Sequence, residues 1–173
     1  LALSAPQLEQ VGQENTVSLS PNDAPSMKAM KNMGRLFQES DSNSAAMIVL
    51  EGDQPLGPGA HKFYDEMVTQ LRADTKHVQH VQDFWGDPLT AGGSQSKDGK
   101  AALTQIYLRG NQGEAMSNES VDAVRKIVDD TPPPPGLHAY VTGASPLVTD
   151  NFEVGSAGTN EVTGITFLVI GLM

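Results

Sequence analysis

The alternation of short apolar runs with amphipathic helical segments is the feature that most restricts the fold of this chain. Between Ala60 and Leu71, apolar side chains recur at intervals of three and four residues, which indicates a helix with one buried face. A second helix is indicated between Ser117 and Val128, where three valines and one isoleucine align in the same way. Runs of strand length precede or follow these helices at 45–51, 76–85, 101–108 and 137–142.

The order of these elements is strand, helix, strand, strand, helix, strand. It predicts a split βαβ, or ferredoxin-like, fold of the α+β class, in which an antiparallel four-stranded sheet carries the helices on one face. An extra helix is expected from about Ala24 to Glu39, because Met27, Met30 and Met33 recur at helical spacing. Residues suited to N-capping stand near the starts of the extra helix and of the second main helix: Asp23 or Ser26, and Ser117 or Asn118.

The chain ends in an almost wholly apolar run, Gly164–Met173. A helix that crosses a bilayer needs about 20 apolar residues, so this run could supply half of one. We interpret it as the start of a transmembrane helix; the alternative is a C-terminal helix buried in a soluble core, which would normally carry polar residues at helical spacing. Because the run stops only where the chain stops, and the chain opens on Leu1, we expect both ends to lie inside a longer protein.

The charge of the chain, formally −10 at pH 7, restricts its partners. Nucleic acids and anionic lipid surfaces select clustered Lys and Arg, so neither is an expected partner. All 11 Lys and Arg residues lie between Lys28 and Lys126. Segments that adjoin transmembrane helices and avoid Lys and Arg lie on the non-cytoplasmic side, so we expect the domain to face outward. An acidic chain with few cations can also produce this distribution by chance.

These features divide the chain into four parts. We expect residues 1–20 to be a membrane-proximal tether and residues 21–143 to be an extracytoplasmic α+β domain. Residues 144–163 are expected to form a membrane-proximal helix and linker, and residues 164–173 the start of a truncated transmembrane helix.

Local motifs supply neither a catalytic nor a metal centre. His77 and His80 would point to opposite faces of a strand. A stretch that resembles a phosphate-binding loop has Ser94 and Ala101 where that loop needs Gly and Ser or Thr. Ser145 lacks the second glycine of a nucleophile elbow. We therefore predict no catalytic residue, no metal site and no cofactor.

Several stretches resemble the MmpL (mycobacterial membrane protein large) transporters of the resistance-nodulation-division superfamily. They are SAAMIVLEGDQPLG, KHVQHVQDFWGDPLTAGGSQSKDGKAA, GNQGEA and YVTGASPL. The similarity runs from about Pro21 to Met173, and the string DFWGDPL at Asp83–Leu89 is specific enough to make it strong. The resemblance implies the extracytoplasmic loop between the first and second transmembrane helices of a proton-driven exporter of lipids or lipidic siderophores. It also implies that the proton relay lies outside this chain.

The resemblance further implies three partners: the second periplasmic loop of the same transporter, a small MmpS-type accessory protein, and the lipidic substrate. Apolar ligands suit a path lined by methionine and aromatic side chains, so we select Phe84, Trp85 and Tyr107 as candidate lining residues. For Phe84 and Trp85 the other interpretation is a hydrophobic anchor where the strand leaves the sheet. Another class also stays open: a freestanding soluble ferredoxin-like binding or enzymatic domain.

Overall fold

The computed structural model describes residues 21, 23–37, 40 and 42–154. Its elements are α2 (Pro25–Phe37), β1 (Ala45–Gly52), α3 (Pro58–Ala73), β2 (Val78–Gln82), α4 (Ala91–Ser94), β3 (Ala101–Leu108), α5 (Ala115–Asp130) and β4 (Leu137–Thr142). Residues 144–154 form a further helix. The expected tether (1–20) and transmembrane start (164–173) lie outside the described residues, as does the last part of the expected linker. Among the described residues, no helix combines the length and apolar character that a membrane span requires.

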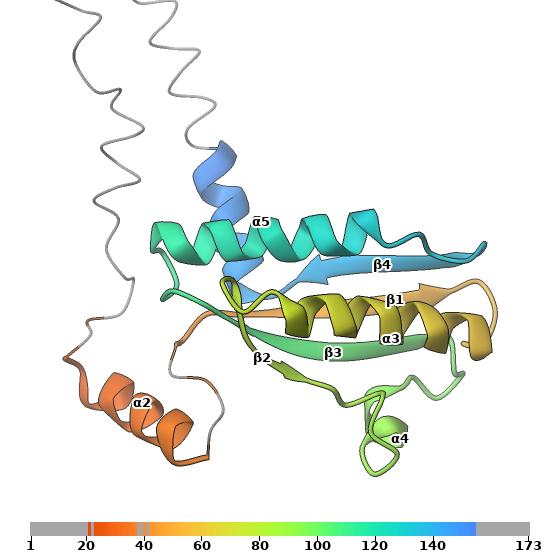
Figure 1. Ribbon diagram of the computed structural model, residues 1–173, viewed down its shortest axis with the longest axis horizontal. Coiled ribbons are helices and arrows are strands. Elements are labelled where there is room, and N and C mark those ends of the chain that lie inside the picture. The colour runs from red at the N-terminus through yellow and green to blue at the C-terminus, as the bar shows by residue number, and fades with distance from the viewer. Residues whose placement is uncertain (1–20, 22, 38–39, 41, 155–173) are drawn as a thin grey trace, which may run out of the picture.

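The four strands form one sheet in the order β2-β3-β1-β4, and every neighbouring pair is antiparallel. Helix α3 connects β1 to β2, which lie on either side of β3, and α5 connects β3 to β4, which lie on either side of β1. Both helices cover the same face of the sheet (Figure 1). This topology confirms the predicted ferredoxin-like fold.

The hydrophobic core lies between this sheet face and the two helices. Side chains alternate between the two faces of a strand, so every second residue of β1 and β3 points toward the helices. Helix α3 contributes the side chains that its spacing predicts, from Ala60 to Leu71. The largest fully buried side chains of the core are Ile48, Leu50, Tyr64, Met67, Leu71, Ile106, Leu108, Val121 and Val124. The opposite sheet face carries neither helix (Figure 1).

The residues predicted to cap two helices do not occupy the N-cap positions, although α2 begins within one residue of its expected start. Helix α5 begins at Ala115, so Ser117 lies inside it, buried, with its Oγ 2.6 Å from Ser44 Oγ. The N-cap position is taken by Glu114, whose carboxylate instead accepts hydrogen bonds from the backbone and side-chain amides of Asn111. Helix α2 begins at Pro25, a favoured first residue, so Ser26 lies inside the helix and Asp23 stands two residues before it.

The helix at 144–154 is attached to the sheet by a buried hydroxyl cluster. Gly143 has a φ of +117° beside the backbone of Met47, which a side chain would disfavour. Immediately after it, Ser145 Oγ lies 2.9 Å from Ser44 Oγ and accepts a hydrogen bond from the Ala45 backbone amide. Arg125 of α5 forms an ion pair with Asp150 of the same helix. These contacts hold the described start of this helix against β1 and α5.

Candidate functional site

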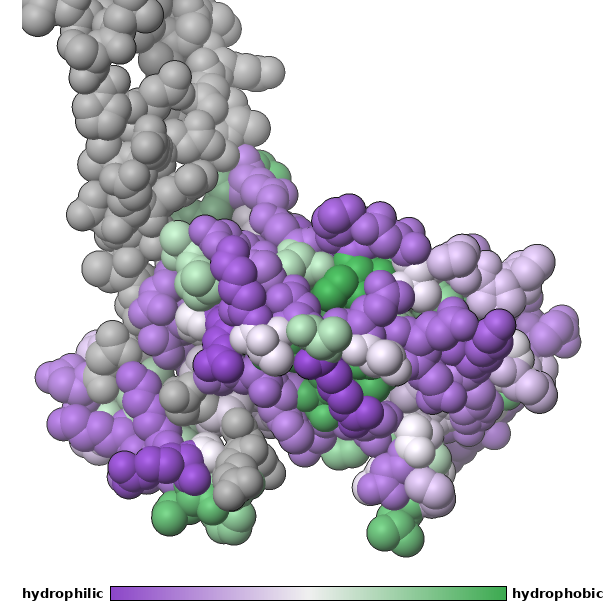
Figure 2. Space-filling model, viewed as in Figure 1, coloured by the Kyte–Doolittle hydropathy of each residue, from purple (hydrophilic) through white to green (hydrophobic). Residues whose placement is uncertain are grey.

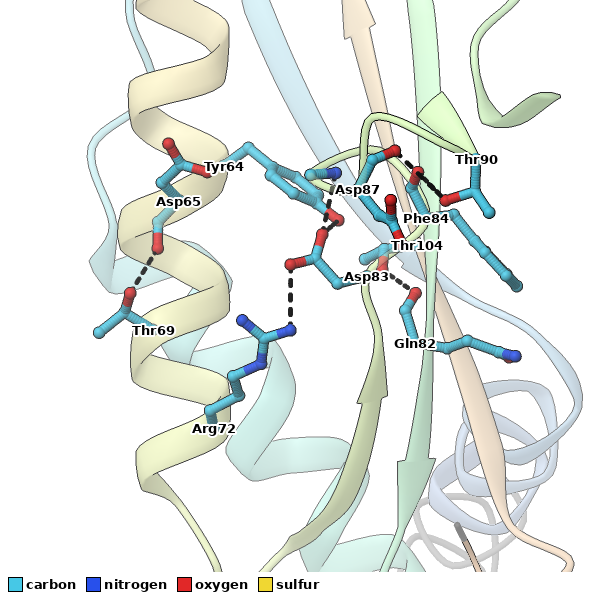
Figure 3. Close-up of polar contacts among 11 residues, drawn as sticks. Tyr64, Asp65, Thr69, Arg72, Gln82, Asp83, Phe84, Asp87, Thr90 and Thr104 are labelled. Carbon is cyan, nitrogen blue, oxygen red and sulfur yellow. Dashed lines mark hydrogen bonds and ion pairs between the residues drawn. The ribbon is translucent and has the colours of Figure 1, made fainter. Parts of the chain in front are cut away.

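The DFWGDPL stretch is organised around the carboxylate of Asp83, one residue beyond β2. The Tyr64 hydroxyl of α3 donates to Asp83 Oδ1 at 2.6 Å, and the Gly86 backbone amide donates to the same oxygen at 2.9 Å. Arg72, in the last turn of α3, lies with its Nη2 3.0 Å from Asp83 Oδ2 (Figure 3). The carboxylate therefore joins α3 to the turn that leaves the sheet, and β2 ends at Gln82 instead of the predicted Trp85.

The electrostatics of this contact keep Tyr64 protonated. Burial, followed by the hydrogen bond to the Asp83 carboxylate, raises the pKa of the Tyr64 hydroxyl well above its usual value. A protonated hydroxyl can donate to the carboxylate, whereas a phenolate would repel it. The raised pKa therefore favours the hydrogen bond that joins α3 to the turn.

Trp85 lies in the core and not on an open surface. It is 2% exposed, stacks on His61 at a ring separation of 3.9 Å, and meets the Tyr64 ring edge-on at 5.1 Å. Both partners belong to α3. This position agrees with the interpretation of Trp85 as a hydrophobic anchor.

Phe84 is directed differently from its neighbour. Its half-buried side chain and that of Gln82 both point away from α3 (Figure 3). Its carbonyl accepts a hydrogen bond of 2.7 Å from the Thr90 hydroxyl, which holds the loop that leads to α4. Leu89 is 93% exposed in this loop. Figure 2 shows apolar surface on two projections, one at this loop and one at α2.

Tyr107 lies on the sheet face that α3 and α5 leave uncovered, here called the open face. An apolar row crosses this face, because Val49 of β1 pairs with Leu103 of β3 on one side and with Tyr140 of β4 on the other. Met47 stands two residues along β1 on the same face. Met47 and Leu103 are each 39% exposed and Tyr140 is 49% exposed.

The three predicted lining residues therefore do not converge on one pocket. Tyr107 and Phe84 point away from α3, whereas Trp85 packs against it. Part of the open face was not selected from the sequence. Met47 and Val49 belong to a continuous apolar run, but only alternate residues of that run contact the helices. The apolar residues at odd-numbered positions of β1 and β3 could have indicated an apolar surface on the second face of the sheet.

The histidines have separate surroundings. His77 Nδ1 lies 2.7 Å from Asp74 Oδ2, whereas the His80 ring lies 6.2 Å from that of Tyr107, its cross-strand partner. Within the described ranges, no three His, Cys, Asp or Glu side chains are grouped in a way that could hold a metal ion.

The structure is therefore a ferredoxin-like α+β domain with an apolar surface on the uncovered face of its sheet. The sequence pattern of the MMPL family matches residues 18–173. Siderophore exporter MmpL5 of Mycobacterium tuberculosis (strain CDC 1551 / Oshkosh) is 57% identical over 173 residues, covering 100% of this chain and 18% of that protein. Probable transport protein MmpL4 of Mycobacterium leprae (strain TN) is 60% identical over 165 residues, covering 95% and 17%.

A more distant relative is phthiocerol dimycocerosate exporter MmpL7 of Mycobacterium tuberculosis (strain ATCC 25618 / H37Rv). It is 34% identical over 157 residues, covering 91% of this chain and 17% of that protein. The chain belongs to the MMPL family, within the resistance-nodulation-division superfamily. It spans less than a fifth of the length of these relatives.

Proposed function

We infer that this chain is the extracytoplasmic porter domain of a proton-driven exporter of lipids or lipidic siderophores, and that its open face forms part of the substrate path. Two relatives are named as exporters of molecules of this kind, a siderophore and phthiocerol dimycocerosate. Phe84 and Tyr107 are the proposed lining residues, and Trp85 anchors the turn that carries Phe84.

The observation that carries this proposal is the apolar row on the open face. Tyr140, Val49 and Leu103 are brought into register by β4, β1 and β3, so their side chains form one surface. Exposed contiguous apolar patches mark sites of contact with other apolar molecules. Four strands about 4.8 Å apart give this surface a width of about 14 Å across the sheet, enough to support an extended acyl chain.

The extracytoplasmic placement is supported by the distribution of cations, since all 11 Lys and Arg residues lie between Lys28 and Lys126. This chain contains no cysteine, so an introduced thiol is the only one within it, and labelling of the transporter without the substitution serves as the baseline. In the intact transporter, Lys97→Cys should react with a membrane-impermeant maleimide added to whole spheroplasts. Reaction only after lysis would place the domain in the cytoplasm.

Partner docking is supported by the exposed apolar side of α2. Met33, Leu36 and Phe37 are exposed there, whereas Met27 and Gly34 of the same helix are buried. We assign this side of α2 to contact with the second periplasmic loop of the transporter or with a small MmpS-type accessory protein. Substitution of Leu36 and Phe37 by serine should weaken co-purification of such a partner without unfolding the domain, because neither side chain belongs to the core.

The substrate-path proposal is tested by mapping where a neutral amphiphile binds. Dodecyl maltoside, added below its micelle-forming concentration to the ¹⁵N-labelled chain, should shift the amide resonances of Met47, Val49, Leu103 and Tyr107. Leu103→Glu should abolish these shifts, and Leu89→Glu is the matched control because Leu89 is more exposed but lies outside the sheet. Shifts confined to α2, or equal effects of both variants, would contradict the proposal.

A further inference from the structure

A small cationic depression lies at the outer edge of β2. Its volume is about 200 Å³, and its lining consists of Arg72, Thr75, Val78, Gln79, His80, Val81 and Arg109. The lining contains two guanidinium groups and no carboxylate, in a chain whose formal net charge is −10. A second depression, lined by Glu51, Asp53 and Asp98 among others, shows the acidic character more typical of this chain. Because Arg72 is already paired with Asp83, it is chiefly Arg109 that suits the β2 depression to an anion.

The two guanidinium groups are held in place by other contacts. Arg109 Nε donates to the Thr75 carbonyl at 3.3 Å, and within the described part of the chain its Nη groups have no hydrogen-bond or ion-pair partner. Arg72 is oriented by its ion pair with Asp83. Guanidinium groups bind the oxygens of phosphates and carboxylates through parallel N–H donors, and prior orientation lowers the entropy lost on binding.

His80 connects this depression to the open face. It lines the depression, and its ring lies 6.2 Å from that of Tyr107, with which it pairs across β2 and β3. A β-bulge between Val78 and His80 interrupts the regular alternation of β2 at this point. Bulges commonly redirect side chains beside binding sites. An elongated ligand can therefore contact the apolar row at one end and the cationic depression at the other.

We propose that the β2 depression binds the oxyanion head group, a phosphate or a carboxylate, of an amphiphile whose apolar chain lies on the open face. This inference rests on the proposed function, and it narrows the substrate class from lipids in general to amphiphiles with an acidic head group. Arg109 and Arg72 hold the head group, and the apolar row contacts the chain. The volume of the depression suits a head group and excludes the lipid tail.

The test compares three probes on the purified chain: monododecyl phosphate, dodecyl maltoside and inorganic phosphate, with the amphiphiles kept below their micelle-forming concentrations. Monododecyl phosphate should bind about tenfold more tightly than either other probe, because a hydrogen bond to a charged group is added to the apolar contact. Arg109→Gln should reduce its affinity to that of dodecyl maltoside and leave dodecyl maltoside binding unchanged. Arg109→Lys should retain part of the preference, and Lys97→Gln, an exposed cation outside the depression, should retain all of it.

The outcomes separate this inference from the proposed function. Equal binding of the two dodecyl amphiphiles, insensitive to Arg109→Gln, overturns the head-group site and leaves the apolar substrate path standing. Inorganic phosphate binding as tightly as monododecyl phosphate overturns the amphiphile and indicates a free-phosphate site. Failure of both amphiphiles to bind overturns the proposed function itself. The unfolding midpoint of Arg109→Gln, read from Trp85 fluorescence, verifies that the variant is folded.

Discussion

Replacement of Asp83 by alanine tests whether this carboxylate holds the DFWGDPL turn on the sheet. The substitution leaves the buried Tyr64 hydroxyl without its acceptor, which costs about 1–3 kcal/mol. It also removes the Arg72 ion pair, which contributes less than about 1 kcal/mol because the Arg72 side chain is 55% exposed. The free energy of unfolding should therefore fall by about 1–4 kcal/mol. That is a large part of the total for a domain of this size, about 5–15 kcal/mol.

The assay is urea unfolding followed by the fluorescence of Trp85, the only tryptophan in the chain, which lies two residues from the substitution. With a urea dependence of about 2 kcal/mol per molar, the unfolding midpoint should fall by about 0.5–2 M. Asp87→Ala is the matched control, since Asp87 Oδ1 accepts only the exposed Leu89 amide at 2.9 Å. It should lower the free energy of unfolding by less than about 1 kcal/mol.

A double-mutant cycle identifies the partner responsible. Tyr64→Phe combined with Asp83→Ala should destabilise the chain by about 1–2 kcal/mol less than the sum of the single substitutions, because both remove the same hydrogen bond. Additive effects, or an Asp83→Ala effect no larger than that of Asp87→Ala, would refute the role of Asp83 as the link between α3 and the turn.

Three further predictions concern the same framework. The folded-state pKa of Tyr64 is raised, so its contribution to stability is complete below its unfolded-state pKa of about 10 and is lost as the pH rises above that value. Above pH 10 the free energy of unfolding should therefore fall more steeply than in Tyr64→Phe, by up to about 1.4 kcal/mol per pH unit. Urea titrations from pH 8 to 11 measure this difference. Gly110→Ala should lower the free energy of unfolding by about 1–3 kcal/mol, because Gly110 has a φ of +81° and an added Cβ would lie 2.6 Å from the Ser117 backbone nitrogen. Gly57→Ala is the control: there is open space around Gly57, so the thermal unfolding midpoint should change little. Ser44→Ala should lower the free energy of unfolding by about 1–3 kcal/mol and increase proteolysis within 144–154, because the hydroxyls of Ser117 and Ser145 lose their shared partner. Unchanged proteolysis would show that the hydroxyl cluster does not attach this helix to the sheet.

Local sequence patterns predicted those helices and strands whose ends are determined by residues nearby in the sequence. The strand 101–108 has the predicted bounds, because its apolar residues stand between Gly99 and Gly110. The predicted strand 76–85 is too long, because its end depends on the contact of Asp83 with Tyr64, 19 residues earlier. The spacing of apolar residues does not indicate a contact between residues that far apart in the sequence.

The candidate site was predictable only in part. Tyr107 was found by its residue type, and the structure places it on the open face. Trp85 has the same aromatic character but packs against α3, because residue type alone does not determine which face of the sheet a side chain occupies. Met47 and Leu103 were missed, since continuous apolar runs predict burial on both faces whereas helices cover only one.

The most direct test of the substrate path is photocrosslinking in the intact transporter. A p-benzoylphenylalanine placed at Leu103, on the open face, should form an adduct with the exported lipid when cells are irradiated during transport. The same residue at Lys62, on the solvent side of α3, is the control and should form none. Lipid adducts at Leu103 alone are the predicted result. Lipid adducts at neither position, or equally at both, would contradict the assignment of the open face to the substrate path.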